Sequence, residues 1–136
     1  MTDKNMIGES VKKITIYKSI TCSLDDSVSS IALKLKNNKE RRIFVIDNQS
    51  MLVGIITTTD LVYKVLGSEK INGSLKAKDI MVGDVKSIDI AGDLEGALSI
   101  MNELKTFTCP VTDKKKLVGV LSYHDLVNYV FSSLRK

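Results

Sequence analysis

Hydrophobic residues along the chain follow helical and strand spacings in an order that occurs twice. In the first half, apolar residues over 28–35 keep the i, i+3, i+4, i+7 spacing of an amphipathic helix. Apolar, β-branched runs at 43–46 and 52–56 flank a polar turn and predict the two buried strands of a hairpin. An apolar stripe over 61–66 predicts a closing helix, and the run 20–22 predicts a short strand ahead of the first helix.

The second half of the chain predicts the same elements in the same order. A short strand is expected at 86–88 and an amphipathic helix at 94–101, followed by strands at 109–112 and 117–121 and a helix over 126–134. Each half therefore predicts a short β-strand followed by helix–strand–strand–helix. The predicted fold class is α/β (α+β), built from two packed repeats.

The recurrence extends to residue identity, which indicates an internal duplication. Residues 52–62 and 117–127 are identical at six of eleven positions, at an offset of 65 residues. A unit of about 60 residues buries too little surface to be comfortably stable alone. We therefore expect two domains, 11–73 and 76–134, joined by a linker at 67–73 and packed around a pseudo-two-fold axis.

Composition places the chain among folded proteins and excludes several classes. Of its 136 residues, 43% are hydrophobic and 26% are charged, which is typical of a globular protein. No apolar run approaches the roughly 20 residues that a membrane-spanning helix needs. The charged N-terminus is not followed by the apolar segment of a secretory signal. We expect a cytoplasmic protein without a membrane partner.

The charge is mildly basic, with a net value of +4 and lysines spread along the chain. We interpret the clusters at 39–42 and 114–116 as solvated turn and helix-end charges, with contact to phosphates as the alternative. Aromatic residues such as Phe44, Tyr63 and Phe131 occupy positions expected in the core. This placement disfavours the stacking platform of a nucleic-acid binder.

The chain carries no pattern typical of a catalytic or metal site. Cys22 and Cys109 lie in strand-like segments without a Cys-x-x-Cys motif, so we expect buried free thiols. The single histidine, His124, leaves too few ligands for a zinc site. Neither a Ser–His–Asp set nor a Walker loop is apparent. We expect no enzyme activity and no metal or cofactor.

A Thr/Ser-x-x-Asp motif opens the last helix of each repeat, as Thr57-x-x-Asp60 and Ser122-x-x-Asp125. The motif fits an N-terminal capping box, which stabilises a helix by about 1 kcal/mol and needs no ligand. It also fits a binding site, because a helix N-terminus favours phosphate and a carboxylate can accept both hydroxyls of a ribose. The residues alone leave both interpretations open.

In their context these motifs resemble the cystathionine-β-synthase (CBS) domain. The resemblance rests on residues 54–60 and 119–125, is supported by 110–113 and 78–81, and covers the chain from about residue 11 as a tandem pair, or Bateman module. It implies a non-catalytic sensor that binds AMP, ADP, ATP or S-adenosylmethionine, as a regulatory ligand, in the clefts between two repeats. It also implies a symmetric homodimer with helices packed across the two-fold axis.

The resemblance carries binding roles over to positions in both repeats. It implies that the motif hydroxyls face phosphate or ribose and the motif carboxylates face the ribose diol. It implies that the first short strands and the backbone of the hairpin strands form the adenine pocket. His124 stands where many relatives have a basic residue, whereas Thr59 stands there in the first repeat. The residues carried over are Thr21, Phe44, Val45, Thr57, Asp60, Ser87, Pro110, Val111, Ser122, His124 and Asp125.

Two other interpretations of the same repeat stay open. In the first, the chain is a structural dimerisation scaffold with vacant sites, and the motifs serve only as helix caps. In the second, it is a weakly basic nucleic-acid binder. The sequence identifies neither the adenosine-bearing ligand nor the protein that the module regulates.

Overall fold

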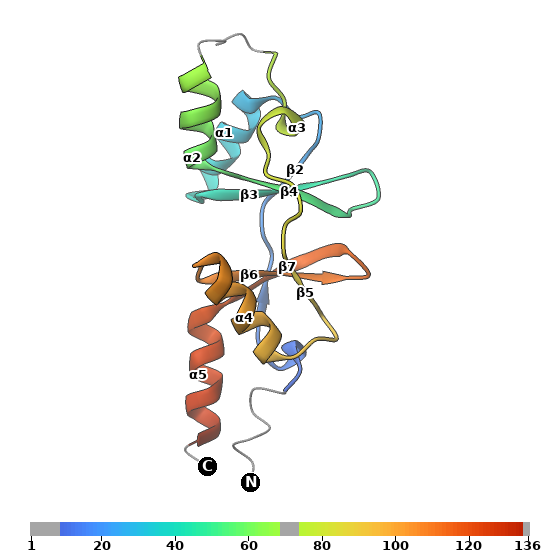
Figure 1. The fold of residues 1–136 in the computed structure, drawn as a ribbon, viewed down its shortest axis with the longest axis vertical. Coiled ribbons are helices and arrows are strands. Elements are labelled where there is room, and N and C mark those ends of the chain that lie inside the picture. The colour runs from blue at the N-terminus through green and yellow to red at the C-terminus, as the bar shows by residue number, and fades with distance from the viewer. Residues whose placement is uncertain (1–8, 69–73, 135–136) are drawn as a thin grey trace. The chain divides into compact units, whose positions relative to one another are not determined.

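The computed structural model describes residues 9–68 and 74–134, which form two compact units. The N-terminal unit spans residues 19–85, and the C-terminal unit combines the chain up to residue 18 with the chain from residue 86 onward. In each unit the helices lie on one side of the β-hairpin (Figure 1). Most of the linker predicted at 67–73 lies outside the described residues.

The N-terminal unit has the order of strands and helices that the sequence predicts. Its elements are β2 (Thr21–Ser23), α1 (Val28–Asn38), β3 (Arg42–Ile46), β4 (Leu52–Thr57), α2 (Thr58–Asp60), the π-helix η3 (Leu61–Val65), the 3₁₀ helix η4 (Leu66–Ser68) and α3 (Ala77–Ile80). The sheet order is β2-β3-β4, with β2 parallel and β4 antiparallel to the central strand β3. The last helix begins at the Thr-x-x-Asp motif, so the sheet and the motif are directly connected.

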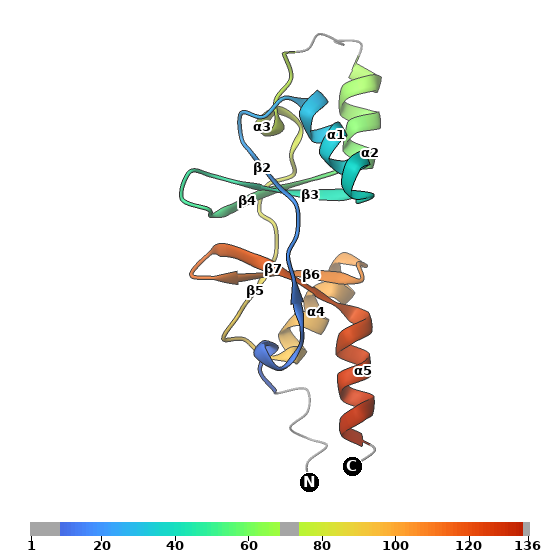
Figure 2. The same ribbon diagram turned by 180° about the vertical axis from the view of Figure 1, so that it is seen from behind.

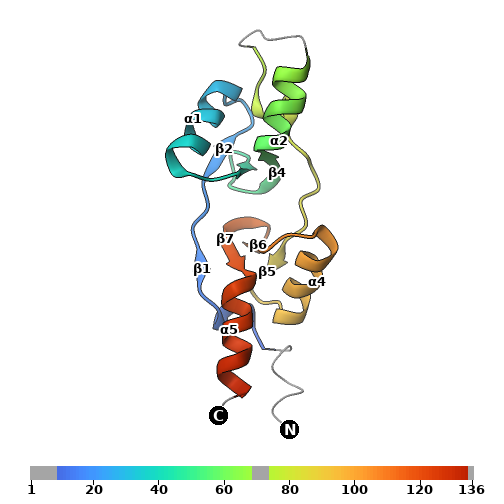
Figure 3. The ribbon, with the colours of Figure 1, turned by 90° about the vertical axis from the view of Figure 1, so that its left-hand side faces the viewer.

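The C-terminal unit repeats this order and gains one strand from the start of the chain. Its elements are the 3₁₀ helix η2 (Val11–Lys13), β1 (Ile16–Tyr17), β5 (Ile88–Asp89), α4 (Leu94–Leu104), β6 (Thr108–Asp113), β7 (Lys116–Ser122) and α5 (Tyr123–Leu134). The sheet order is β1-β7-β6-β5, and β1 runs antiparallel to β7 (Figure 2). Helices α4 and α5 pack side by side (Figure 3).

Side-chain caps and apolar faces explain why α1 and α4 form where they do. The side chain of Ser27 accepts a hydrogen bond from the Ser30 amide at 3.1 Å, and that of Asp93 accepts one from the Gly96 amide at 2.9 Å. Such caps satisfy amides that have no partner within the helix. Both helices end at a lysine with left-handed backbone geometry. Three residues of each predicted apolar face are buried, which confirms both helices, although Ala32 of the α1 face is exposed.

Each unit buries the opening segment of the other repeat in its core. Val11 and Ile14 are buried in the core of the C-terminal unit, whereas Ala77 and Ile80 are buried in the core of the N-terminal unit. The four positions correspond in the two copies of the sequence repeat. The domain ranges expected from the sequence stay a prediction. Each core also contains the opening segment of the other repeat.

Glycine permits the close crossing of these opening segments over the hairpin strands. A Cβ atom at Gly119 would overlap the carbonyl oxygen of Tyr17 on β1. A Cβ atom at Gly54 would lie 2.5 Å from the sulfur of Met81. A side chain at Gly119 would therefore push β1 away from β7, whereas one at Gly54 would displace the side chain of Met81.

Two of the three aromatic residues expected in the core are exposed. Phe44 is 2% exposed, but Tyr63 and Phe131 are 74% and 57% exposed. Tyr63 lies in η3 and Phe131 in α5, the helices that follow the motif in the two units. In both helices the apolar surface is wider than the part that the unit covers. Burial of aromatic residues, which disfavours a nucleic-acid binder, therefore holds for Phe44 but not for Tyr63 or Phe131.

Candidate functional site

The predicted site residues form two sets, one in each unit. The N-terminal unit holds Thr21, Phe44, Val45, Thr57 and Asp60. The C-terminal unit holds Ser87, Pro110, Val111, Ser122, His124 and Asp125. In each set the motif hydroxyl and carboxylate meet at the first turn of the last helix, and the two turns differ in detail.

Asp60 is fully engaged by its own unit. Its Oδ2 accepts hydrogen bonds from the Thr57 amide at 2.9 Å and from the Thr57 hydroxyl at 3.2 Å. The Asp60 amide in turn donates to the Thr57 hydroxyl oxygen at 3.2 Å, which completes a capping box. The carboxylate is buried. This geometry supports the helix-cap interpretation of the first motif.

Lys64 occupies the remaining oxygen of the same carboxylate. Its Nζ lies 3.1 Å from Asp60 Oδ1, one helical turn along the chain. The same ammonium donates to the carbonyl oxygen of Ile80 at 3.0 Å and so ties η3 to α3. Lys64 thereby connects the motif to α3, the opening segment of the second repeat.

Asp125 occupies the corresponding place in the C-terminal unit but is differently bonded. Its amide donates to the Ser122 hydroxyl at 3.1 Å, so Ser122 caps α5 as Thr57 caps α2. Its Oδ2 is buried and has no hydrogen-bond partner among the described residues. A buried carboxylate oxygen without a donor costs free energy, because water would otherwise solvate it. In the second motif, Oδ2 of Asp125 can therefore accept a hydrogen bond from a ligand.

Tyr17 reaches Asp125 from the neighbouring strand. It lies on β1 opposite Val120 of β7, two residues before the Ser122 cap. A hydrogen bond to the Asp125 carboxylate, together with its negative charge, raises the pKa of the Tyr17 hydroxyl. The counterpart of Tyr17 in the N-terminal unit is Val82, which pairs with Ile55 as Tyr17 pairs with Val120, and a valine has no hydroxyl to donate.

His124 and Ser122 line a hollow of about 520 Å³ at the start of α5. The other lining residues are Phe107, Thr108, Tyr123 and Val127. The side-chain amide nitrogen of Asn128 lies 3.1 Å from His124 Nε2. An amide nitrogen only donates, so in this arrangement the imidazole carries its proton on Nδ1, which is left to donate elsewhere.

The residues predicted to surround adenine lie in and beside the central strands. The side chains of Phe44, Val45, Pro110 and Val111 are buried. Strands β3 and β6 each lie between two other strands, so much of their backbone is committed to the sheet. Ser87 lies just before β5, with its hydroxyl 3.4 Å from that of Thr112. Their role toward a base stays a prediction.

The thiols offer no reactive nucleophile at neutral pH. Cys22 and Cys109 are buried and free, as the sequence predicts. Burial raises the pKa of each thiol to about 11, which keeps both protonated. Within residues 9–68 and 74–134, no three acidic, histidine or cysteine side chains gather as a metal site, and no helix is long and apolar enough to cross a bilayer.

Two residues of the motif environment, Lys64 and Tyr17, are not among those predicted from the sequence. Lys64 follows Asp60 by four residues, and this spacing alone would have indicated an ion pair on a helix. Tyr17 lies near the start of the first repeat, and only the pairing of β1 with β7 brings it to Asp125 in the C-terminal unit. No local pattern in the sequence indicates that contact.

Comparison with known proteins agrees with the two-repeat architecture. A family model described as the CBS domain matches residues 11–67 and 77–132. The Bacillus subtilis protein YlbB is 33% identical over 106 residues, which cover 77% of this chain and 71% of that protein. Three uncharacterized proteins from Methanocaldococcus jannaschii and Methanopyrus kandleri also match, and the chain spans 33% to 67% of their length.

Solved structures of CBS-domain proteins share the fold at low sequence identity. A CBS-domain pair in complex with 5-methylthioadenosine and S-adenosyl-L-methionine matches with a TM-score of 0.69 at 24% identity, covering 94% of this chain and 98% of that one. The cytosolic domain of the Mg²⁺ channel MgtE in complex with ATP gives a TM-score of 0.74 at 17% identity, covering 88% and 48%. The predicted fold class is confirmed.

Proposed function

Because the chain belongs to the CBS-domain family, we propose that it is a non-catalytic regulatory module that binds an adenosine-bearing small molecule such as AMP, ADP, ATP or S-adenosylmethionine. The observation that carries the proposal is the buried Oδ2 of Asp125, which has no hydrogen-bond partner among the described residues. A ligand hydroxyl that donates to this oxygen relieves a cost of about 1–3 kcal/mol. A cytoplasmic location stays a prediction.

The surroundings of Asp125 suit a ribose phosphate. A vicinal diol presents two donors, and a carboxylate has acceptor positions for both. Ser122 and His124 line the adjoining hollow and offer a hydroxyl and an imidazole N–H to a phosphate. The start of α5 adds the positive end of the helix dipole, although the amides of Tyr123 and Asp125 already donate to Phe107 and Ser122. The two solved CBS structures described above, which contain adenosine-bearing ligands, support this choice of ligand class.

Adenine nucleotides or S-adenosylmethionine are expected to raise the melting temperature of the protein. A ligand at 100 times its dissociation constant stabilises the folded state by about 2.7 kcal/mol, which shifts the melting temperature by several degrees. A thermal-shift panel of AMP, ADP, ATP and S-adenosylmethionine checks this, with guanosine nucleotides as the control. Equal shifts with guanosine, or no shift with any compound, would favour the scaffold interpretation.

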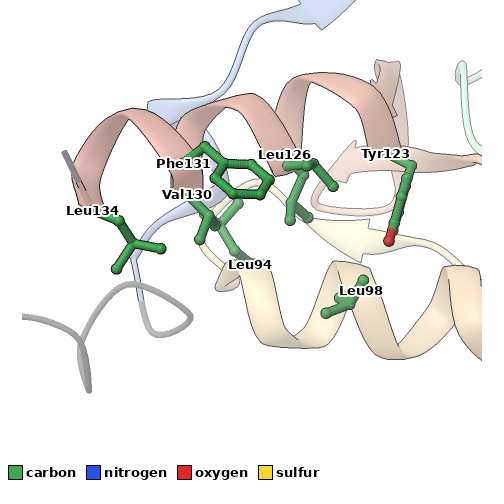
Figure 4. Close-up of a pocket in the computed structure, with 8 residues that line it drawn as sticks. Leu94, Leu98, Tyr123, Leu126, Val130, Phe131 and Leu134 are labelled. Atoms are coloured by element: carbon green, nitrogen blue, oxygen red, sulfur yellow. The ribbon is translucent and has the colours of Figure 1, made fainter.

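We also propose that the helical surface of the C-terminal unit binds a second copy of the chain. An apolar groove of about 230 Å³ runs between α4 and α5. Figure 4 shows Leu94 of α4 beside Val130 of α5, and Leu98 of α4 on the side of Leu126 and Tyr123. Phe131 and Leu134 are both more than half exposed. A homodimer related by a two-fold axis would cover such a surface with its own counterpart.

A charge placed in this groove is expected to dissociate the dimer. In Phe131→Glu the dimer would bury an unpaired carboxylate in an apolar contact, which is strongly unfavourable. Analytical ultracentrifugation at tens of micromolar should show a dimer for the wild type and a monomer for the variant. Ser132→Glu is the matched control, since it places the same charge on the exposed neighbouring position of α5. A monomeric wild type would contradict the proposal.

A further inference from the structure

We infer that each chain holds one ligand, in the C-terminal repeat, because Lys64 occupies the carboxylate of the first repeat and excludes a ligand from it. The inference rests on the proposed function and goes beyond it, since it names the residue that sets the stoichiometry. Asp60 and Asp125 occupy the same position in the two copies but are differently bonded.

A ribose at Asp60 would have to displace bonds that the folded chain already makes. Oδ2 holds the amide and hydroxyl of Thr57, and Oδ1 holds the ammonium of Lys64. Displacing Lys64 would also release the carbonyl oxygen of Ile80 from its donor. The diol would have to replace an ion pair and the donor of the Ile80 carbonyl with hydrogen bonds in which only the carboxylate is charged. The exchange is therefore unfavourable.

The second repeat has no counterpart to this lysine. In the repeat register Lys64 corresponds to Tyr129, whose side chain packs against the core of the C-terminal unit. Among the described residues no cation forms a salt bridge with Asp125, and its Oδ2 is without a donor. Tyr17, whose hydroxyl pKa the Asp125 carboxylate raises, is uncharged and therefore leaves the negative charge of Asp125 uncompensated.

Isothermal titration calorimetry with AMP and with S-adenosylmethionine tests the inference through stoichiometry. The wild type is expected to bind one ligand per chain, and Asp125→Asn to abolish that event. Lys64→Met removes the ammonium while keeping the aliphatic stem, and is expected to raise the stoichiometry to two. Lys64→Arg keeps the charge and should retain one site. Lys36→Met, at an exposed lysine of α1, is the matched control for loss of a positive charge.

Each outcome bears on a different part of the inference. Two sites in the wild type, or loss of the single site in Asp60→Asn, would overturn it while leaving the proposed function standing. A stoichiometry of one in Lys64→Met would show that Lys64 does not control the first site. Absence of binding by the wild type to either probe would overturn the inference and the proposed function together. If Lys64→Met fails to fold, Lys64→Gln keeps a neutral donor for the Ile80 carbonyl and serves in its place.

Discussion

Deletion of residues 1–18 is expected to unfold the C-terminal unit, although the whole second repeat of the sequence is retained. The deletion removes Val11 and Ile14, which are 0% and 6% exposed in the core of that unit. It also removes β1, which pairs with β7. Each buried aliphatic side chain contributes about 1.5–3 kcal/mol. The combined loss is a large part of the roughly 5–15 kcal/mol that stabilises a typical domain.

Substitutions at the two corresponding isoleucines make this expectation site-specific. Ile14 and Ile80 occupy equivalent positions of the repeat, and each is buried in the unit of the other repeat. Ile→Ala at a buried site costs about 2–5 kcal/mol. Hydrogen exchange should show faster opening of residues 86–134 in Ile14→Ala and of residues 19–68 in Ile80→Ala. Opening of the same unit by both variants would contradict this packing.

The order of elements could be predicted from the sequence because periodicity reports which residues are buried. The amphipathic spacing of α1 and α4 and the β-branched runs of β3, β4, β6 and β7 all correspond to observed elements. The strand boundaries differ by at most one residue at each end, and both helices extend three residues further. Periodicity does not report the partner that buries a residue. Val11 and Ala77 are equivalent positions of the sequence repeat. Only tertiary packing shows that Val11 is buried in the C-terminal unit and Ala77 in the N-terminal unit.

The helix after the first motif shows a second limit of local pattern. The stripe over residues 61–66 predicts one amphipathic helix, but the chain forms a short α-turn followed by η3 and η4. Leu61 and Val65 pack against the core, whereas Val62 and Leu66 are 50% and 64% exposed. An apolar stripe can thus be wider than the surface that the folded unit covers, and the excess is available to a partner.

The Thr/Ser-x-x-Asp turns could be predicted from the sequence, but comparison of the two motifs did not predict how they differ. The Thr/Ser-x-x-Asp motif is the same in both repeats, so its chemistry alone predicts two equal sites. The difference arises from Lys64, which lies one turn after Asp60, and from Tyr17, which reaches Asp125 across the sheet. Motif comparison excludes such neighbours because they lie outside the motif.

Replacement of the two motif carboxylates is expected to change stability and binding in opposite ways. Asp60→Ala removes the capping box and the partner of Lys64. Loss of a cap costs about 0.5–2 kcal/mol and a partly exposed ion pair contributes up to about 1 kcal/mol. We therefore expect Asp60→Ala to lower the free energy of unfolding of the unliganded protein by about 2 kcal/mol, with ligand affinity nearly unchanged.

Asp125→Ala is expected to leave the unliganded protein as stable as the wild type, or more stable. The substitution removes the Tyr17 contact, but it also removes a buried oxygen that has no partner among the described residues. Ligand binding would then lose its hydrogen bonds to a charged acceptor, each contributing about 1.5–3 kcal/mol, so affinity should fall at least tenfold. Urea unfolding without ligand and calorimetric titration with AMP and S-adenosylmethionine measure the two effects on the same pair of variants. A stability loss in Asp125→Ala as large as in Asp60→Ala, with affinity retained, would identify both motifs as helix caps.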